Sequence, residues 1–195
     1  MAGIKEVMVG APATATGAIN TFNGTSPVLP TTATAVLAGN TALGYVGEDG
    51  LTETQEQSVE KIKAWGGDTV KVLQTEHGLS YSFQFLENSS AVMQEVYGED
   101  NVTTTPATES SGSLTDVAVK AGTLPIKPYV FDMKDGDALI RIVLPQGQII
   151  ERGDITYVHS DIIRYQVTIE ALPDANGVKA YKYIVHDDQL AGSPA

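Results

Sequence analysis

The chain has 195 residues, of which 42% are hydrophobic, a size and composition that predict one folded domain with a real core. It carries 24 acidic against 12 basic residues, a formal net charge of −12, which argues against nucleic-acid binding through phosphates because such binding needs clustered lysine and arginine. It contains no cysteine, which excludes a disulfide framework and thiolate chemistry.

The first 45 residues are the least regular part of the chain. Their only charged residues are Lys5 and Glu6, and alanine, threonine and glycine dominate between scattered prolines. Such a segment alone would hardly offset the entropy lost on ordering. Residues 1–45 therefore form either a floppy terminus or an extended N-terminal arm ordered only against other subunits, with one short strand at 32–39. The apolar stretch at 7–9 is too short for a signal peptide and no run is long enough to span a bilayer, so we expect a protein made and kept in a cytoplasm.

Residues 51–67 fit two incompatible patterns. As a helix, the segment would begin at an N-cap Thr52 and end at Gly66. As an extended segment, it is polar on both faces and runs through a Gly66-Gly67 turn of type I′ or II′ into a strand-like run at 68–76. The pattern favours the hairpin, although propensity alone leaves the helix open.

From residue 68 onward the sequence predicts antiparallel β-structure. Residues 78–87 alternate, so that Ser80, Ser82 and Gln84 share one face and three aromatic residues share the other. One dry and one wet face for each strand are typical of an antiparallel β-sandwich or barrel. Two further strand pairs flank hairpin turn signals: 127–133 with 138–144 across Asp135-Gly136 (type I′), and 161–172 with 178–186 across Asn176-Gly177.

One helix is expected to flank the strands, at about residues 88–97. Asn88 is predicted as its N-cap and Gly98 as its C-terminal stop, and a single apolar stripe suits packing across a sheet. Residues 99–116 are polar and lack periodicity, which predicts a long surface loop.

No motif for catalysis, a cofactor or a metal is convincing. His77, His159 and His186 are far apart in sequence and belong to no metal-binding pair. The run at 186–188 could bind a divalent cation, but exposed tail carboxylates explain it better, and residues 132–138 lack the spacing of a calcium loop. We therefore expect neither an enzyme nor a bound cofactor or metal.

The order of motifs between residues 44 and 102 resembles the major tail tube protein of long non-contractile-tailed phages, with the forms infecting actinobacteria most similar. The resemblance rests on residues 44–71, the aromatic strand that follows them, and residues 87–102. The motif IKAWGG at 62–67 is its most specific part.

The resemblance implies a structural virion protein, assembled in the host cytoplasm, whose residues 46–195 form one β-sandwich domain. Subunits would join sheet edges into hexameric rings, and the rings would stack into a hollow tube that conducts DNA without binding it specifically. Closing a ring would also remove open strand edges, which are otherwise an aggregation liability. The implied partners are further copies of the protein and the tape measure, tail terminator and tail-tip proteins, with no membrane and no cofactor.

The resemblance also implies where subunits meet. Residues 46–60 would be an extended stacking loop that contacts the next ring, with Leu51, Glu53 and Glu56 as contact residues. The turn that follows the loop consists of Trp65, Gly66 and Gly67.

The acidity predicts the character of the tube wall. A basic lumen would hold passing DNA through counterion release, so we expect the lumen to be lined by wet strand faces poor in lysine and arginine. Arg164 should point elsewhere or pair with Asp161. The candidate lumen residues are Glu76, Ser80, Ser82, Gln84 and Glu87.

Two other functions stay open. A monomeric β-sandwich that binds carbohydrate or acts as an adhesin would predict an exposed aromatic platform, whereas the single tryptophan abuts a turn. A tube protein of a contractile injection machine is a closer alternative.

Overall fold

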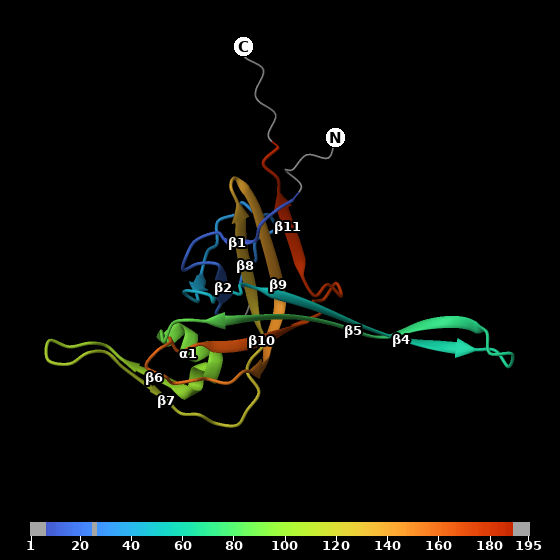
Figure 1. Ribbon diagram of the computed structural model, residues 1–195. Helices are drawn as coiled ribbons and strands as arrows, with labels where there is room; N and C mark the ends of the chain where they lie inside the picture. Colours follow the sequence, from blue (N-terminus) through green and yellow to red (C-terminus); the bar gives the residue numbers. More distant parts are fainter. Residues whose placement is uncertain (1–6, 25–26, 189–195) are drawn as a thin grey trace, which may run out of the picture.

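The computed structural model describes residues 7–24 and 27–188 (Figure 1). Antiparallel strands dominate the described residues, and one α-helix interrupts them. The elements are β1 (Ala11–Pro12), β2 (Ile19–Phe22), β3 (Asn40–Ala42), β4 (Thr52–Lys63), β5 (Thr69–Phe85), α1 (Ser90–Tyr97), a 3-10 turn (Glu99–Asn101), β6 (Val102–Thr105), β7 (Leu114–Val117), β8 (Lys127–Asp135), β9 (Ala138–Arg152), β10 (Tyr165–Leu172) and β11 (Tyr181–Val185).

One curved sheet builds the body of the molecule. Its nine strands follow the order β3-β2-β8-β9-β10-β5-β4, with β1 paired to β8 and β11 paired to β9. The ring centroid of Tyr81 on β5 lies 5.3 Å from that of Phe131 on β8, although β9 and β10 separate these two strands in the sheet. The two halves of the sheet therefore face each other across a buried aromatic core, as in a sandwich, but the sheet does not close into a barrel.

The Asp135-Gly136 signal correctly marks the hairpin of β8 and β9. The strands meet at the pair Asp135–Ala138, which leaves Gly136 and Asp137 as the two loop residues. Only Gly136 has a positive φ, +59°, whereas a type I′ turn needs two such residues. The predicted type I′ geometry is therefore wrong, and the pattern fits type II′.

The predicted hairpin across Asn176-Gly177 is wrong. β10 and β11 do not pair with each other but lie end to end along the same side of β9, β10 opposite Gln146–Arg152 and β11 opposite Leu139–Val143. Residues 174–178 only close a local turn, in which the Asp174 and Val178 backbones bond at 2.9 Å. The turn signal was real, but β9 is long enough to supply partners for both strands.

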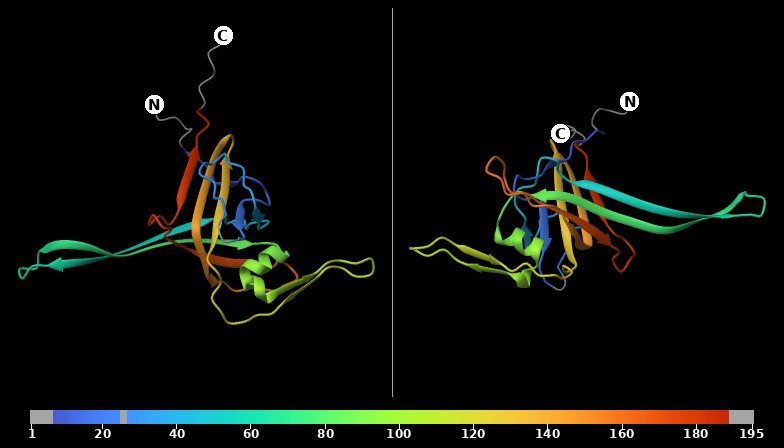
Figure 2. Two further views of the ribbon diagram at one scale, coloured as in Figure 1. Left: turned by 180° about the vertical axis from the view of Figure 1, so that it is seen from behind. Right: turned by 60° about the horizontal axis from the view of Figure 1, so that its bottom comes forward.

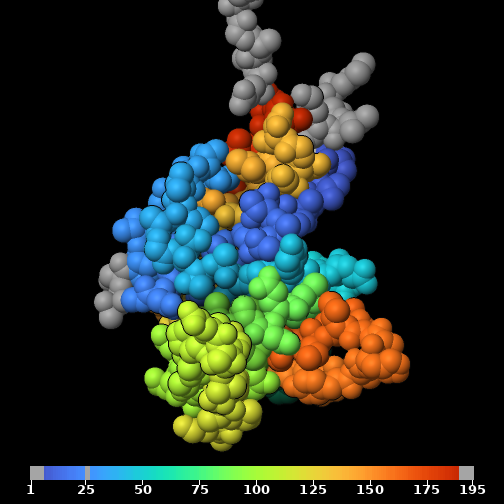
Figure 3. All heavy atoms as spheres, turned by 90° about the vertical axis from the view of Figure 1, so that its left-hand side faces the viewer, coloured from blue at the N-terminus to red at the C-terminus, as the bar shows by residue number. Residues whose placement is uncertain are grey.

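The described part of the predicted arm packs into the domain. β2 pairs with β8 and β3 pairs with β2, and Ile19, Phe22 and Leu43 are fully buried. Figure 3 shows this segment, in blue, lying over the gold strands β8 and β9. No strand forms at 32–39, where the chain makes bends and turns instead. Residues 1–6 and 25–26 of the predicted arm lie outside the described residues.

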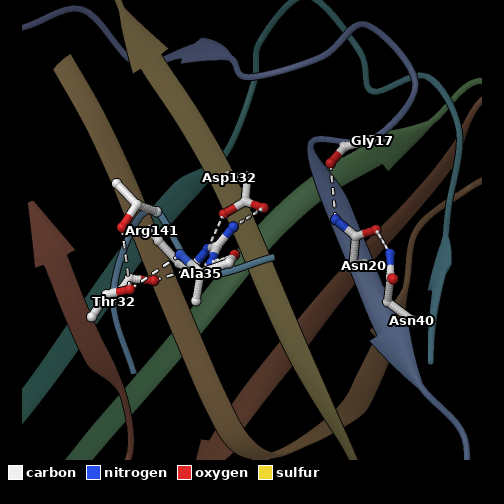
Figure 4. A network of polar contacts seen from close by, with 8 residues as sticks. Gly17, Asn20, Thr32, Ala35, Asn40, Asp132 and Arg141 are labelled. Carbon is white, nitrogen blue, oxygen red and sulfur yellow. Dashed lines mark hydrogen bonds and ion pairs between the residues drawn. The ribbon is translucent and has the colours of Figure 1, made fainter. Parts of the chain in front are cut away.

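A buried arginine holds the N-terminal segment on the sheet (Figure 4). Arg141 on β9 is bidentate to Asp132 on β8, at 2.5 and 3.0 Å, and donates to the backbone carbonyls of Ala35 at 2.6 Å and Thr32 at 3.0 Å. Backbone carbonyls outside regular strands are thereby satisfied by side-chain donors, which is what an irregular segment needs in order to pack.

The helix and the loop after it differ in detail from the prediction. Ser89, not Asn88, is the N-cap, since its hydroxyl accepts from the Val92 N–H, and Gly98 ends the helix at φ +95° as predicted. Residues 102–117 are not an irregular loop, because β6 and β7 form a two-stranded hairpin. This hairpin and that of β4 and β5 project in opposite directions from the body (Figure 2).

Candidate assembly surfaces

The hairpin of β4 and β5 is the largest projection of the described chain (Figures 1 and 2). Its strands stay paired from Thr52–Ser82 out to Lys63–Thr69, and Leu79 is the outermost buried residue of β5. At about 3.3 Å per residue, the pairs beyond Leu79 extend roughly 30 Å into solvent. The extended structure predicted for residues 51–67 is confirmed, and the helical alternative is wrong.

The tip of this hairpin is a three-residue loop of Trp65, Gly66 and Gly67. The Ala64 N–H donates to the Asp68 carbonyl at 2.8 Å, and the Gly67 N–H donates to the Ala64 carbonyl at 2.9 Å. Only Gly67 has a positive φ, +91°. This is a type I turn followed by a glycine bulge, so the predicted two-residue turn of type I′ or II′ is wrong.

The three predicted stacking residues lie at the root of the hairpin, in different environments. Leu51 packs against the main core. The half-buried Glu53 accepts hydrogen bonds from Lys182 on β11 and from Gln55, both at 2.7 Å. Glu56 alone is exposed, on the opposite face of β4. The three side chains therefore do not form one patch.

The charge on Glu53 is held by its neighbours. Partial burial raises the pKa of its carboxyl, but the hydrogen bonds from Lys182 and Gln55 and the charge of Lys182 help to outweigh that effect, and the pKa is lowered. An ionised Glu53 paired with Lys182 ties the root of the hairpin to β11.

The outer half of the hairpin carries a surface that the sequence analysis missed. Exposed apolar side chains occupy both of its faces around a fully exposed Trp65, and three exposed lysines lie among them. A signal in the sequence could have revealed this surface: apolar residues occur on both faces of a strand pair, although neither face packs against the core. We call these residues the hairpin tip: Val59, Lys61, Ile62, Lys63, Trp65, Val70, Lys71 and Val72.

The predicted lumen residues Ser80, Ser82 and Gln84 lie on one continuous polar surface. They occupy the face of β5 opposite its buried aromatic side chains, and the Ser82 hydroxyl lies 3.1 Å from that of Thr168 on β10. None of the side chains on this surface is a lysine or an arginine. We call it the polar face, and it consists of Thr52, Thr54 and Glu56 from β4, Ser80, Ser82 and Gln84 from β5, and Gln166, Thr168 and Glu170 from β10.

The two predicted glutamates at the ends of this strand have different positions. Glu76 lies farther out on the hairpin, opposite Ser58, and continues the polar face towards the tip. Glu87 accepts the Tyr45 N–H at 3.0 Å and lies against Gly44, where an added Cβ would be 2.3 Å from its carboxyl carbon. Glu87 therefore fastens the chain before β4 and is not part of the polar face.

Arg164 pairs with Asp161, as predicted. Its guanidinium nitrogen lies 2.7 Å from the carboxylate oxygen, and both side chains are exposed. This hydrogen bond, with one from the Ile162 N–H, lowers the pKa of Asp161. Arg164 lines the same pocket as Gln84 and Gln166, and its charge is paired there with that of Asp161.

A sequence model described as "Phage tail tube protein" matches residues 1–194. The chain belongs to the phage tail tube protein family. The resemblance stated above is confirmed at the level of this family, which is a structural family and not one of enzymes. A tail tube protein is a component of the virion tail.

Three solved structures are among those to which the chain is similar. One is the sheath-tube complex of an extracellular contractile injection system (PVC, extended state), with 6% identity over 72% of this chain and 86% of that chain and a TM-score of 0.44. The tube-terminating cap of the anti-feeding prophage has 8% identity over 95% of this chain and 100% of that chain, with a TM-score of 0.45. The baseplate structure of the anti-feeding prophage has 12% identity over 89% of this chain and 97% of that chain, with a TM-score of 0.34. A search of curated proteins found no match.

Within residues 7–24 and 27–188, no group of three acidic, histidine or cysteine side chains could hold a metal ion. No helix in that same part of the chain is long and apolar enough to cross a membrane.

Proposed function

We propose that this tail tube protein forms hexameric rings that stack into the tube through which phage DNA is delivered. The observation that carries the proposal is the hairpin of β4 and β5, a long projection that contributes nothing to the core of its own subunit beyond its root. A strand edge of this length, left unpaired, is a template for pairing with another chain. In a tube it would be covered by neighbouring subunits.

The polar face supports a conduit function. Each contact between a phosphate and a lysine or arginine adds affinity by releasing counterions. A wall of hydroxyl, amide and carboxylate groups offers no such contact and repels the backbone. Lined by the polar face, the tube would let DNA slide, and the surplus of 24 acidic over 12 basic residues would act in the same direction.

Further parts of the tail are expected partners. The tube needs a protein that sets its length, one that ends it and one that starts it, and we assign these roles to the tape measure, tail terminator and tail-tip proteins. Assembly takes place in the host cytoplasm before the virion is released.

Size-exclusion chromatography and negative-stain microscopy of the purified protein test the proposal. Hollow tubes whose end-on class averages show six-fold symmetry are expected. A species that stays monomeric at every concentration, or averages with another symmetry, would contradict it. In virions, a contractile sheath around the tube would instead assign the protein to a contractile machine.

A further inference from the structure

We propose that Trp65 of one subunit inserts into an apolar cavity at the opposite end of a second copy of this chain. The inference rests on the proposed stacking of subunits and names the two surfaces that meet. Trp65 is the only tryptophan in the sequence, and at the hairpin tip it is fully exposed to solvent. An indole in water is the largest unburied apolar group that the chain carries, and tryptophan is the residue most typical of buried interface anchors.

The cavity lies where β1, β2 and β8 meet the segment before β4. It measures about 350 Å³, at the small end of the range for ligand pockets, so an indole ring fits. Side chains of Pro12, Ile19, Val46, Phe131 and Met133 line it. Its lining is mainly apolar, which suits a hydrophobic knob.

The chain cannot fill this cavity with its own Trp65. Leu51 lines the cavity immediately before β4, whereas Trp65 follows β4, so the two lie at opposite ends of this extended strand. At about 3.3 Å per residue they are roughly 40 Å apart. A contact between one end of a subunit and the other end of the next is heterologous, and such contacts build rings or open polymers.

Charge complementarity supports this pairing. Three lysines, Lys61, Lys63 and Lys71, lie on the same outer half of the hairpin as Trp65, against two acidic residues, Glu60 and Asp68, so this part is net positive in a chain with a net charge of −12. The exposed Glu48 lines the cavity and the exposed Asp49 is next to it. Opposite charges around an apolar centre match the usual arrangement of a buried core and a polar rim.

The single tryptophan makes the contact directly measurable. Assembly of the wild-type protein should shift the Trp65 emission to shorter wavelength and reduce acrylamide quenching severalfold. Trp65→Ala should raise the critical concentration for polymerisation at least about tenfold, the usual effect of truncating a buried anchor. Glu48→Lys should also raise it, whereas Glu109→Lys, at the tip of the other hairpin, should not.

Cross-linking identifies the acceptor, because the chain has no native cysteine. A Cβ at Gly66 would meet nothing within 4 Å, so Gly66→Cys leaves the loop intact. Mixed with a Glu48→Cys chain, it should give a dimer with a short bismaleimide, and Glu109→Cys is the matched control. Equal cross-linking to both would overturn the inference.

Three outcomes separate the possibilities. Tubes that form while Trp65 stays exposed would overturn this contact and leave the proposed tube intact. A wild-type chain that never assembles would overturn both. If residues 1–6 of the same chain occupied the cavity, the cross-link would appear only after their deletion, and that result would also overturn the inference.

Discussion

At the scale of single residues, the buried charge of Glu95 is central to how the helix sits on the sheet. Glu95 on α1 is 5% exposed and accepts hydrogen bonds from Lys127 and from the Tyr129 hydroxyl, both at 2.8 Å. A buried carboxylate is tolerated only when its oxygens are paired. This trio therefore fixes the helix in one position.

Removing the cation of this trio should destabilise the subunit. Lys127→Met leaves Glu95 without its positive partner, and we expect the free energy of unfolding to fall by about 3 kcal/mol, as for other broken buried pairs. The double variant Lys127→Met with Glu95→Gln should recover part of the loss, because the uncompensated charge is gone. Urea unfolding of the unassembled subunit measures both, and equal losses in the two variants would contradict the explanation.

The environment of the Tyr129 hydroxyl should make the folded protein less stable at alkaline pH. Burial, followed by the charge and hydrogen bond of Glu95, raises the pKa of its hydroxyl well above the usual value. A raised folded-state pKa means that the stabilisation is complete below the unfolded pKa, near 10, and is lost as the pH rises towards the folded pKa.

The free energy of unfolding should thus fall from about pH 10 upward. Tyr129→Phe should make the slope shallower by up to about 1.4 kcal/mol per pH unit, the contribution of one proton. Denaturant titrations between pH 9 and 11 check this. The same slope in both proteins would show that the Tyr129 hydroxyl ionises as freely in the folded state as in the unfolded one.

At the scale of elements, the hairpin of β4 and β5 separates local from global stability. Its outer half has few buried contacts, so strain at the tip should open it locally and leave the body folded. Melting of the whole domain is therefore a poor reporter of the tip.

Gly67 and Gly66 form a matched pair for testing the turn. Gly67→Val should cost on the order of 1–3 kcal/mol, because valine is strained at the φ of +91° found there. Gly66→Val should cost far less, since Gly66 has no positive φ and a Cβ there meets nothing within 4 Å. Amide hydrogen exchange of residues 59–72 should accelerate at least about tenfold in the first variant only. Acceleration in both would favour a two-glycine turn.

At the scale of the whole molecule, the polar face decides how the tube treats DNA. Ser82→Lys together with Gln84→Lys places two cations on this face in every subunit. Assembled tubes of this variant should bind DNA, with an affinity that falls steeply with salt, whereas wild-type tubes should not. Thr103→Lys with Ser110→Lys, on the β6–β7 hairpin, is the control for added charge elsewhere. Fluorescence anisotropy of labelled DNA at several salt concentrations gives the answer, and equal binding by both variants would show that the polar face does not line the channel.

The sequence by itself predicted the elements whose signals are local. The alternation of residues 78–87 predicted a strand with one aromatic and one polar face, and the structure has both. Gly98 predicted the end of the helix, and the order of motifs between residues 44 and 102 predicted the family. The same period of two predicted that Ser80, Ser82 and Gln84 share one face, because a strand presents alternate residues to opposite faces.

Only the tertiary structure decided which strands pair and what becomes buried. β10 and β11 look like a hairpin in sequence, but they share β9, because pairing depends on the partner's length as well as on the turn between two strands. Residues 18–24 and 27–43 lack a hydrophobic pattern of their own, yet β8 pairs with β2 and Arg141 binds the carbonyl of Ala35. The energy that orders these residues comes from partners about a hundred positions away. For the same reason no local pattern revealed the apolar cavity, or that Trp65 lies far from the cavity of its own subunit.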